Sequence, residues 1–195
     1  MNIDTLLMHI SGNATLTDTE VESLKSVLIP RPFKQGEIIV NAGDTARYLM
    51  YVTEGYVMTY FTGGDGTDQV VQFAADGWWT GDLFSLSKEN KTLYTTKALC
   101  DGEMLLLPRS AQSQLLDNHI NIEKYFRKLF HNALMRQQMR IIENNINTAE
   151  ERYNSLITTY PKMEQFVPQK YIASYIGITP EFLSKIRKNK TGILS

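Results

Sequence analysis

Apolar residues between Phe33 and Pro108 occur in short runs that are separated by glycines. These runs cover residues 37–40, 48–53, 56–61, 69–73, 95–99 and 104–107. Because glycine adopts positive φ without steric cost, the pattern is typical of short strands joined by tight turns. The sequence predicts a small antiparallel β-roll or jelly roll over this part of the chain.

After Pro108 the apolar residues follow the three- and four-residue steps of a helix. Together they predict one long helix over residues 119–145. Such a helix is about 40 Å long, which is more than a roll of this size covers. We expect its apolar stripe to meet the same helix of a second subunit in a homodimer, since two-fold contacts are the commonest closed assemblies. The alternative is packing within one subunit, against a predicted helix over residues 17–28 and the C-terminal helices.

A further helix is predicted to begin after Thr148, because Glu151 completes a capping box three residues later. It ends before Pro161, and residues 160–168 are expected to connect it to a distinct unit formed by the last 27 residues. The predicted fold class is therefore α+β. We divide the chain into a β-roll domain over 1–117, a long helix over 118–146 and a helical domain over 147–195.

The spacing of residues 169–188 is typical of a helix-turn-helix. Apolar positions on two short helices are supplied by Ile172, Ile176, Leu183 and Ile186. Ala173 leaves room for a close approach of the helices, and Gly177 can take the left-handed conformation that the turn requires. Thr179 is a suitable N-cap and Pro180 a suitable first helical residue, so the second helix is predicted to begin at Pro180.

The polar face of this second helix can bind base edges or phosphates, as a recognition helix does in the major groove. We expect double-stranded DNA to be contacted by Gln169, Lys170, Thr179, Glu181, Ser184, Lys185 and Lys188. The alternative is an ordinary helical hairpin with a solvated charged face.

Charge is divided unevenly along the chain. Residues 1–107 contain seven Lys or Arg and fourteen Asp or Glu, whereas residues 108–195 contain thirteen and seven. An acidic sensing domain joined to a basic domain that binds a polyanion fits this division, and so does chance variation.

The composition, 43% hydrophobic and 21% charged, is that of a soluble globular protein and excludes a disordered chain or a coiled-coil rod. Cys100 is the single cysteine, so the chain alone forms no disulfide and no cysteine-ligated cluster. The first eleven residues lack a signal-peptide pattern, and no run of about 18 apolar residues occurs. We expect a cytoplasmic protein with no membrane contact.

Residues 33–57, with glycines at Gly36, Gly43 and Gly55, strongly resemble the opening of the cyclic-nucleotide-binding β-roll. Joined to the long helix and the helix-turn-helix, nearly the whole chain resembles the CRP/FNR family of bacterial transcription regulators. The resemblance implies a homodimer paired along residues 119–145, in which a small effector in the roll tunes two DNA-binding domains on a two-fold-symmetric operator. It also makes RNA polymerase a candidate partner.

The same resemblance places the effector pocket at Gly81, Asp82, Leu83, Thr92 and Leu93. In cyclic-nucleotide-binding members, a Gly-Glu-Leu segment and an arginine bind the nucleotide. Here Asp82 stands for the glutamate, and Thr92 stands where the arginine is expected. Lys88 and Lys91 lie nearby in sequence, but a lysine does not reproduce the bidentate guanidinium. The sequence therefore argues against cyclic AMP and leaves open both an effector of another kind and a roll that binds no ligand.

Two tryptophans, Trp78 and Trp79, precede this segment. Large aromatic residues of a β-roll are usually core, and this is the expected place for both. The alternative is that they line an apolar pocket for the effector.

Metal-dependent catalysis finds little support in the sequence. No histidine lies between Ile10 and Asn118, so the roll lacks the ligands of a cupin-type metalloenzyme. His9, His119 and His131 are far apart, which also argues against haem. We expect no enzymatic activity, no metal site and no certain cofactor.

Two features depart from the family pattern. Members normally continue into a β-wing that touches the DNA backbone, whereas this sequence ends at Ser195, which lowers the expected affinity for DNA. Pro180 stands where some relatives have a base-reading arginine, although Glu181 and Lys185 match base-contacting positions. A ligand-sensing module that acts through a protein partner, without DNA, is the alternative function.

Overall fold

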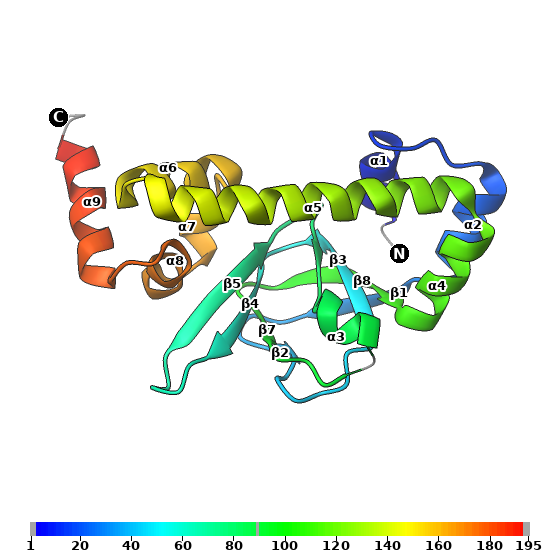
Figure 1. The fold of residues 1–195 in the computed structure, drawn as a ribbon, viewed down its shortest axis with the longest axis horizontal. Helices are drawn as coiled ribbons and strands as arrows, with labels where there is room; N and C mark the ends of the chain where they lie inside the picture. The colour runs from blue at the N-terminus through cyan, green and yellow to red at the C-terminus, as the bar shows by residue number, and fades with distance from the viewer. Residues whose placement is uncertain (1–2, 89, 193–195) are drawn as a thin grey trace.

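The computed structural model describes residues 3–88 and 90–192, in which two sheets form a roll that is flanked by helices (Figure 1). The strands are β1 (Ile29–Phe33), β2 (Ile38–Val40), β3 (Tyr48–Glu54), β4 (Val57–Thr62), β5 (Asp68–Ala74), β6 (Trp79–Thr80), β7 (Thr95–Ala98) and β8 (Gly102–Pro108). The helices are α1 (Asp4–Ser11), α2 (Asp18–Val27), α3 (Leu83–Lys88), α4 (Arg109–Asn118), α5 (Ile120–Ile146), α6 (Ala149–Thr159), α7 (Met163–Phe166), α8 (Gln169–Ile176) and α9 (Pro180–Gly192). The predicted α+β class is confirmed.

The roll consists of two four-stranded sheets with the strand orders β1-β8-β3-β6 and β2-β7-β4-β5. Every strand pair is antiparallel. The core between the sheets contains Phe33, Met50, Val52, Val57, Ala74, Ala98, Met104 and Leu106. The strands predicted from apolar runs are all present, with ends that shift by two residues or fewer, so the predicted β-roll is confirmed.

The prediction missed strands β1 and β6. Strand β1 contains Pro30 and Pro32, which cannot donate to a ladder, and it lies at a sheet edge where only β8 pairs with it. Strand β6 is two residues long and pairs with the middle of β3, which no local pattern announces.

The three glycines of the resemblance all occupy conformations that favour glycine. Gly36, Gly43 and Gly55 have φ values of 82°, 90° and 99°. At Gly55 an added Cβ would also lie 2.9 Å from the carbonyl oxygen of Asp101, so a larger residue would clash with the backbone there.

Helix α2 begins at a capping box and is joined to α5 by a buried carboxylate. Thr17 is the N-cap, so the predicted helix over 17–28 is confirmed with Thr17 and Leu28 as its flanking caps. Glu20, 5% exposed, accepts hydrogen bonds from the backbone N–H and side-chain amide of Asn121 as well as from Thr17. Burial alone would raise the pKa of Glu20, but these hydrogen bonds lower it to about 2.

The two halves of α5 differ in what covers them. In the first half, Ile122, Tyr125 and Phe126 are buried within the subunit against α1, α2 and the roll. Of the partners named in the alternative, α2 is in this cluster and the C-terminal helices are not. In the second half, the apolar side chains are 46–73% exposed at Leu134, Met135, Met139, Ile141, Ile142 and Ile146. The apolar stripe therefore meets its own subunit over one half and is open over the other.

The C-terminal helices share one core with the roll. Side chains of β4 and β5, including Met58, Val70 and Phe73, pack with α6 to α9 in a single buried cluster. Helix α7 lies inside the segment 160–168 that the sequence predicted as a connection. The predicted domain 147–195 extends three residues beyond the described part.

In the described part of the chain, none of the helices is both long and apolar enough to cross a bilayer.

Candidate nucleic-acid interface and effector pocket

Helices α8 and α9 form a helix-turn-helix around a left-handed glycine. Gly177 has φ 73° and ψ 41°, and the amide of Ile178 donates to the carbonyl of Ala173 at 3.0 Å. Ala173 and Leu183 are fully buried where the two helices meet. The helix-turn-helix predicted over residues 169–188 is therefore present, with α9 beginning at Pro180.

The outward face of α9 carries most of the side chains predicted to contact DNA. Glu181, Lys185 and Lys188 are exposed, whereas Ser184 is half-buried. Thr179 caps the helix through a hydrogen bond from the amide of Phe182 to its Oγ1 at 3.2 Å. Hydrogen bonds from its own backbone N–H and from Thr179 lower the pKa of Glu181, which keeps this carboxylate ionised.

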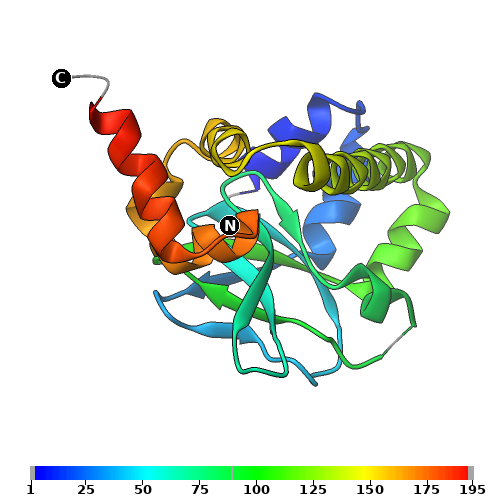
Figure 2. The same cartoon turned by 60° about the vertical axis from the view of Figure 1, so that its left-hand side comes forward.

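The remaining two predicted residues lie on α8. Gln169 and Lys170 are exposed in its first turn, with the Lys170 ammonium 4.7 Å from the ring centroid of Tyr171. The structure thus gathers the predicted DNA-contacting residues on one short motif, which lies at the end of the molecule opposite α1 and α2 (Figure 1) and is turned toward the viewer in Figure 2.

Helix α8 is docked on the edge strand β5. The Ser174 hydroxyl accepts from the amide of Val70 at 3.0 Å and donates to the carbonyl of Asp68 at 2.8 Å. Arg140 of α5 donates to the carbonyls of Val71 and Tyr175. The motif is therefore anchored to both the roll and the long helix, with its outward face left open.

A cavity of about 520 Å³ opens in the roll beside α3. Its lining includes Asp44, Arg47, Asp82, Thr92 and Tyr94. A volume of this size is within the range of small-molecule sites.

The carboxylate of Asp82 is occupied by hydrogen bonds from its own chain. It accepts from the amide of Ser85 at 3.0 Å, the Ser85 hydroxyl at 2.7 Å, the Thr92 hydroxyl at 2.9 Å and the amide of Leu93 at 3.2 Å. Partial burial raises the pKa of Asp82, but these hydrogen bonds outweigh it, so the pKa lies below its ordinary value. An ionised, internally satisfied carboxylate thus faces the cavity.

Comparison with known proteins agrees with this architecture. Residues 30–119 match the family model of the cyclic nucleotide-binding domain. The chain is 26% identical over 187 residues to the probable transcriptional regulator Flp of Lacticaseibacillus casei, covering 89% of this chain and 81% of that protein. The structure of FixK2 from Bradyrhizobium japonicum matches with a TM-score of 0.72 at 18% identity and covers 84% of each chain. A structure from Eubacterium rectale assigned to the CRP/FNR family matches with a TM-score of 0.69 at 16% identity, covering 89% of this chain and 83% of that one.

By these comparisons the chain has the fold of CRP/FNR regulators, with a cyclic nucleotide-binding domain over residues 30–119. Within this domain, the five predicted pocket residues cluster around Asp82, but not all of them face the cavity. Leu83 and Leu93 are 45% and 62% exposed to solvent. Gly81 has φ 153°, and a Cβ there would lie 3.3 Å from Leu49 Cδ1, so its role is close packing.

Two residues of the candidate sites were not predicted from the sequence. Arg47 lines the cavity, yet it stands 35 residues before Asp82, and nothing local relates the two. Phe182 is 48% exposed on α9. Helical spacing from Leu183 and Ile186 could have placed Phe182 outside the core.

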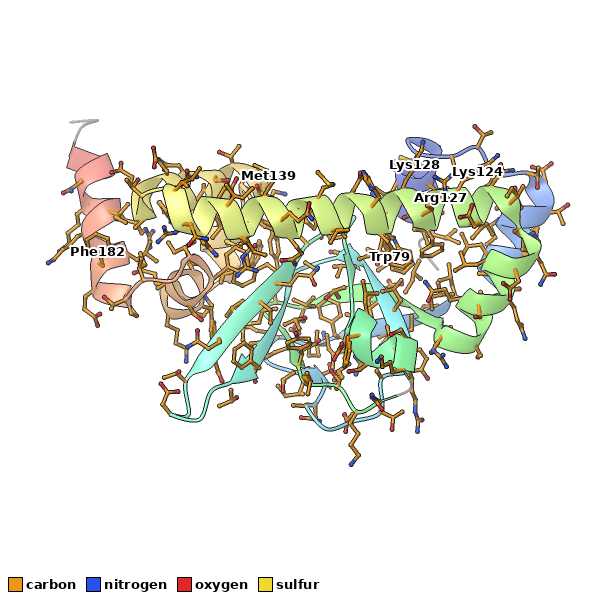
Figure 3. All side chains as sticks on the ribbon, viewed as in Figure 1. Trp79, Lys124, Arg127, Lys128, Met139 and Phe182 are labelled. Carbon is orange, nitrogen blue, oxygen red and sulfur yellow. The ribbon has the colours of Figure 1, made fainter. Side chains whose placement is uncertain are left out.

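The two tryptophans occupy different surroundings. Trp79 is 8% exposed and packs against Tyr51 and Phe126, so the prediction of a core residue is confirmed (Figure 3). Trp78 is half-buried between Arg136, 4.4 Å above its ring centroid, and Tyr160. Neither tryptophan lines the cavity beside α3.

Proposed function

We propose that this protein is a DNA-binding transcription regulator of the CRP/FNR type that acts as a homodimer. The observation that carries the proposal is the exposed face of α9. Glu181 lies in its first turn, which Thr179 caps, and Lys185 and Lys188 follow along the helix. A helix end of this kind enters the major groove, with base contacts near its N-terminus and backbone contacts from flanking cations.

The homodimer is proposed to form along α5. The exposed residues Met135, Met139, Ile142 and Ile146 follow one another by four, three and four positions. This is the spacing of a two-stranded coiled-coil seam, and covering it removes apolar surface from water. Because α9 follows at the C-terminal end of this seam, the dimer would hold two copies of α9 at a fixed separation (Figure 1).

The proposed effector is a small molecule other than cyclic AMP in the cavity beside α3. Support comes from Asp82, whose carboxylate already takes the amide of Leu93 and the hydroxyl of Thr92. A second anion at the same groups would meet a like charge. RNA polymerase is the proposed protein partner on the strength of the family resemblance alone.

Selection from random duplex DNA tests the function. We expect an enriched, roughly palindromic site whose binding weakens steeply with salt, as counterions are released. The variant Lys185→Ala/Lys188→Ala should bind more weakly and lower the salt slope by about one for each lysine that contacts a phosphate. The matched control Lys34→Ala/Lys88→Ala removes two exposed lysines of the roll and should bind as the wild type does.

A selection that enriches no site would overturn DNA binding and favour the protein-partner function. Native mass spectrometry of the purified protein tests the homodimer and the effector, since it reports both the dimer mass and any small molecule that copurifies.

A further inference from the structure

Phe182 occupies the first turn of α9 with its ring turned away from the core. The hydrogen bond from its amide to Thr179 Oγ1 and the one from Leu183 N to Thr179 O fix this turn. Leu183, the next residue, is fully buried against α8, while Phe182 is 48% exposed at the outer end of the molecule (Figure 3).

The fold does not account for this side chain. Phe33, Phe73 and Phe126 are each at most 2% exposed and fill the cores. Phe182 instead shares the exposed part of α9 with Glu181 and Lys185. A large apolar ring is thus held among polar groups, on the turn of the helix that the proposed function places nearest the bases.

The major groove offers one apolar group on the edge of the bases, the C5 methyl of thymine, and phenylalanine is among the side chains that contact it. We propose that Phe182 is a specificity-determining residue that packs on a thymine methyl of each operator half-site. Glu181 beside it is an ionised acceptor suited to the N4 amino group of cytosine. The half-site is therefore expected to contain a thymine and a cytosine. This inference rests on the proposed function.

Replacing thymine by deoxyuridine tests the contact, because it removes the methyl group and keeps every hydrogen-bonding group. The probe is the duplex selected by the wild-type protein, with each symmetry-related thymine pair replaced in turn. We expect one pair to matter, with a loss of affinity of about fourfold per half-site, the effect of burying one methyl group, and about 15-fold for both.

Two variants make the test specific to this residue. Phe182→Ala should bind the thymine and deoxyuridine duplexes equally at that pair. The control Phe61→Ala removes a ring that is 43% exposed on β4 and should keep the full deoxyuridine effect. Circular dichroism and thermal unfolding check that both variants fold.

The outcomes separate this inference from the function on which it rests. Two results would overturn the role of Phe182 and leave DNA binding intact. One is that no deoxyuridine replacement lowers the affinity of the wild type. The other is that the replacement lowers the affinity of Phe182→Ala as much as that of the wild type. Failure of the wild type to select any site overturns both.

Discussion

The guanidinium carbon of Arg140 lies 4.0 Å from the ring centroid of Tyr175. The same group donates to the backbone carbonyls of Val71 in β5 and Tyr175 in α8. One side chain of the long helix thus holds the roll and the first helix of the helix-turn-helix together. Hydrogen bonds from a charged donor and a cation–π contact are both stronger in partly buried places such as this one.

Replacing Arg140 by leucine should therefore loosen the docking of α8. We expect the free energy of unfolding to fall by about 1–3 kcal/mol, because two carbonyls lose their donor. Amide hydrogen exchange over Gln169–Ile176 should also become faster. The control Arg127→Leu alters a side chain that is 65% exposed and pairs with Glu123 at 3.3 Å, and should cost about 0.5 kcal/mol or less. Equal effects of the two substitutions would contradict the role given to Arg140.

A second contact, between His9 and Tyr125, makes stability depend on pH. The indole N–H of Trp79 donates to the Tyr125 hydroxyl at 2.6 Å, and that hydroxyl lies 2.9 Å from His9 Nδ1. The hydroxyl can in turn donate to His9 Nδ1, and a neutral imidazole is the form that accepts there. Burial, and secondarily the charge of Arg136, lower the pKa of His9 below 6.5.

The folded state therefore binds this proton less readily than the unfolded chain does. The stabilisation is fully present above pH 6.5 and is lost as the pH falls toward the lowered pKa. Urea unfolding between pH 8 and pH 5 should show this loss, and His9→Gln should remove the corresponding step. His131→Gln, at an exposed position, should retain it. A wild-type stability that is flat over this range would contradict the assignment.

Local patterns in the sequence predicted the parts of the fold that depend on local chemistry. The capping box at Thr148 and the left-handed turn at Gly177 each arise within a few residues, and both are present. The contacts of Arg140 join residues that are 35 and 69 positions apart, and no spacing rule relates such residues.

The long helix shows the same limit. Its apolar stripe is visible in the sequence, but the division between a covered and an open half depends on where α1, α2 and the roll end. The candidate pocket is a similar case. The sequence predicted that Asp82 and Thr92 lie together, but only the folded structure shows that Arg47 lines the same cavity.

Cyclic AMP is expected not to stabilise this protein. Asp82 already occupies the amide of Leu93 and the hydroxyl of Thr92, so a nucleotide phosphate placed at these groups would meet a like charge. A ligand at a hundred times its Kd stabilises by about 2.7 kcal/mol, which a thermal unfolding assay detects readily. A saturable rise in Tm with cyclic AMP would contradict this reading of the pocket.

The exposed half of α5 predicts a dimer that a single charge disrupts. Met139 is 49% exposed in the middle of the seam, and Met139→Glu would place two carboxylates in a desolvated two-fold contact. We expect the dimer dissociation constant to rise at least about tenfold, as measured by analytical ultracentrifugation. The control Met8→Glu alters a methionine of α1 that is 66% exposed and should leave the dimer unchanged. A Met139→Glu protein that remains dimeric would place the interface elsewhere.

The seam changes character toward its N-terminal end. Eleven residues make about three turns of an α-helix, so Lys124, Lys128 and His131 lie on the same face as Met135, Met139 and Ile142, and all three are exposed. Lys124, Lys128 and Met139 lie on the side of α5 away from the roll (Figure 3). The Lys128 ammonium donates to the carbonyl of Asn13 in its own subunit at 2.6 Å. In a parallel two-fold dimer Lys124 faces its own copy, so this end of the seam is repulsive.

Dimerisation should therefore strengthen with added salt, in contrast to DNA binding. Lys124→Ala is expected to lower the dimer dissociation constant by about two- to fivefold at low ionic strength, the range for an exposed charge pair. Added salt should reduce the difference between the dimer dissociation constants of Lys124→Ala and the wild type, since salt screens the repulsion that the variant lacks. Because salt also strengthens apolar association, that difference is the quantity to measure by ultracentrifugation. Lys34→Ala on the roll is the control, and a Lys124→Ala dimer no tighter than the Lys34→Ala dimer would show that Lys124 does not face its copy in the dimer.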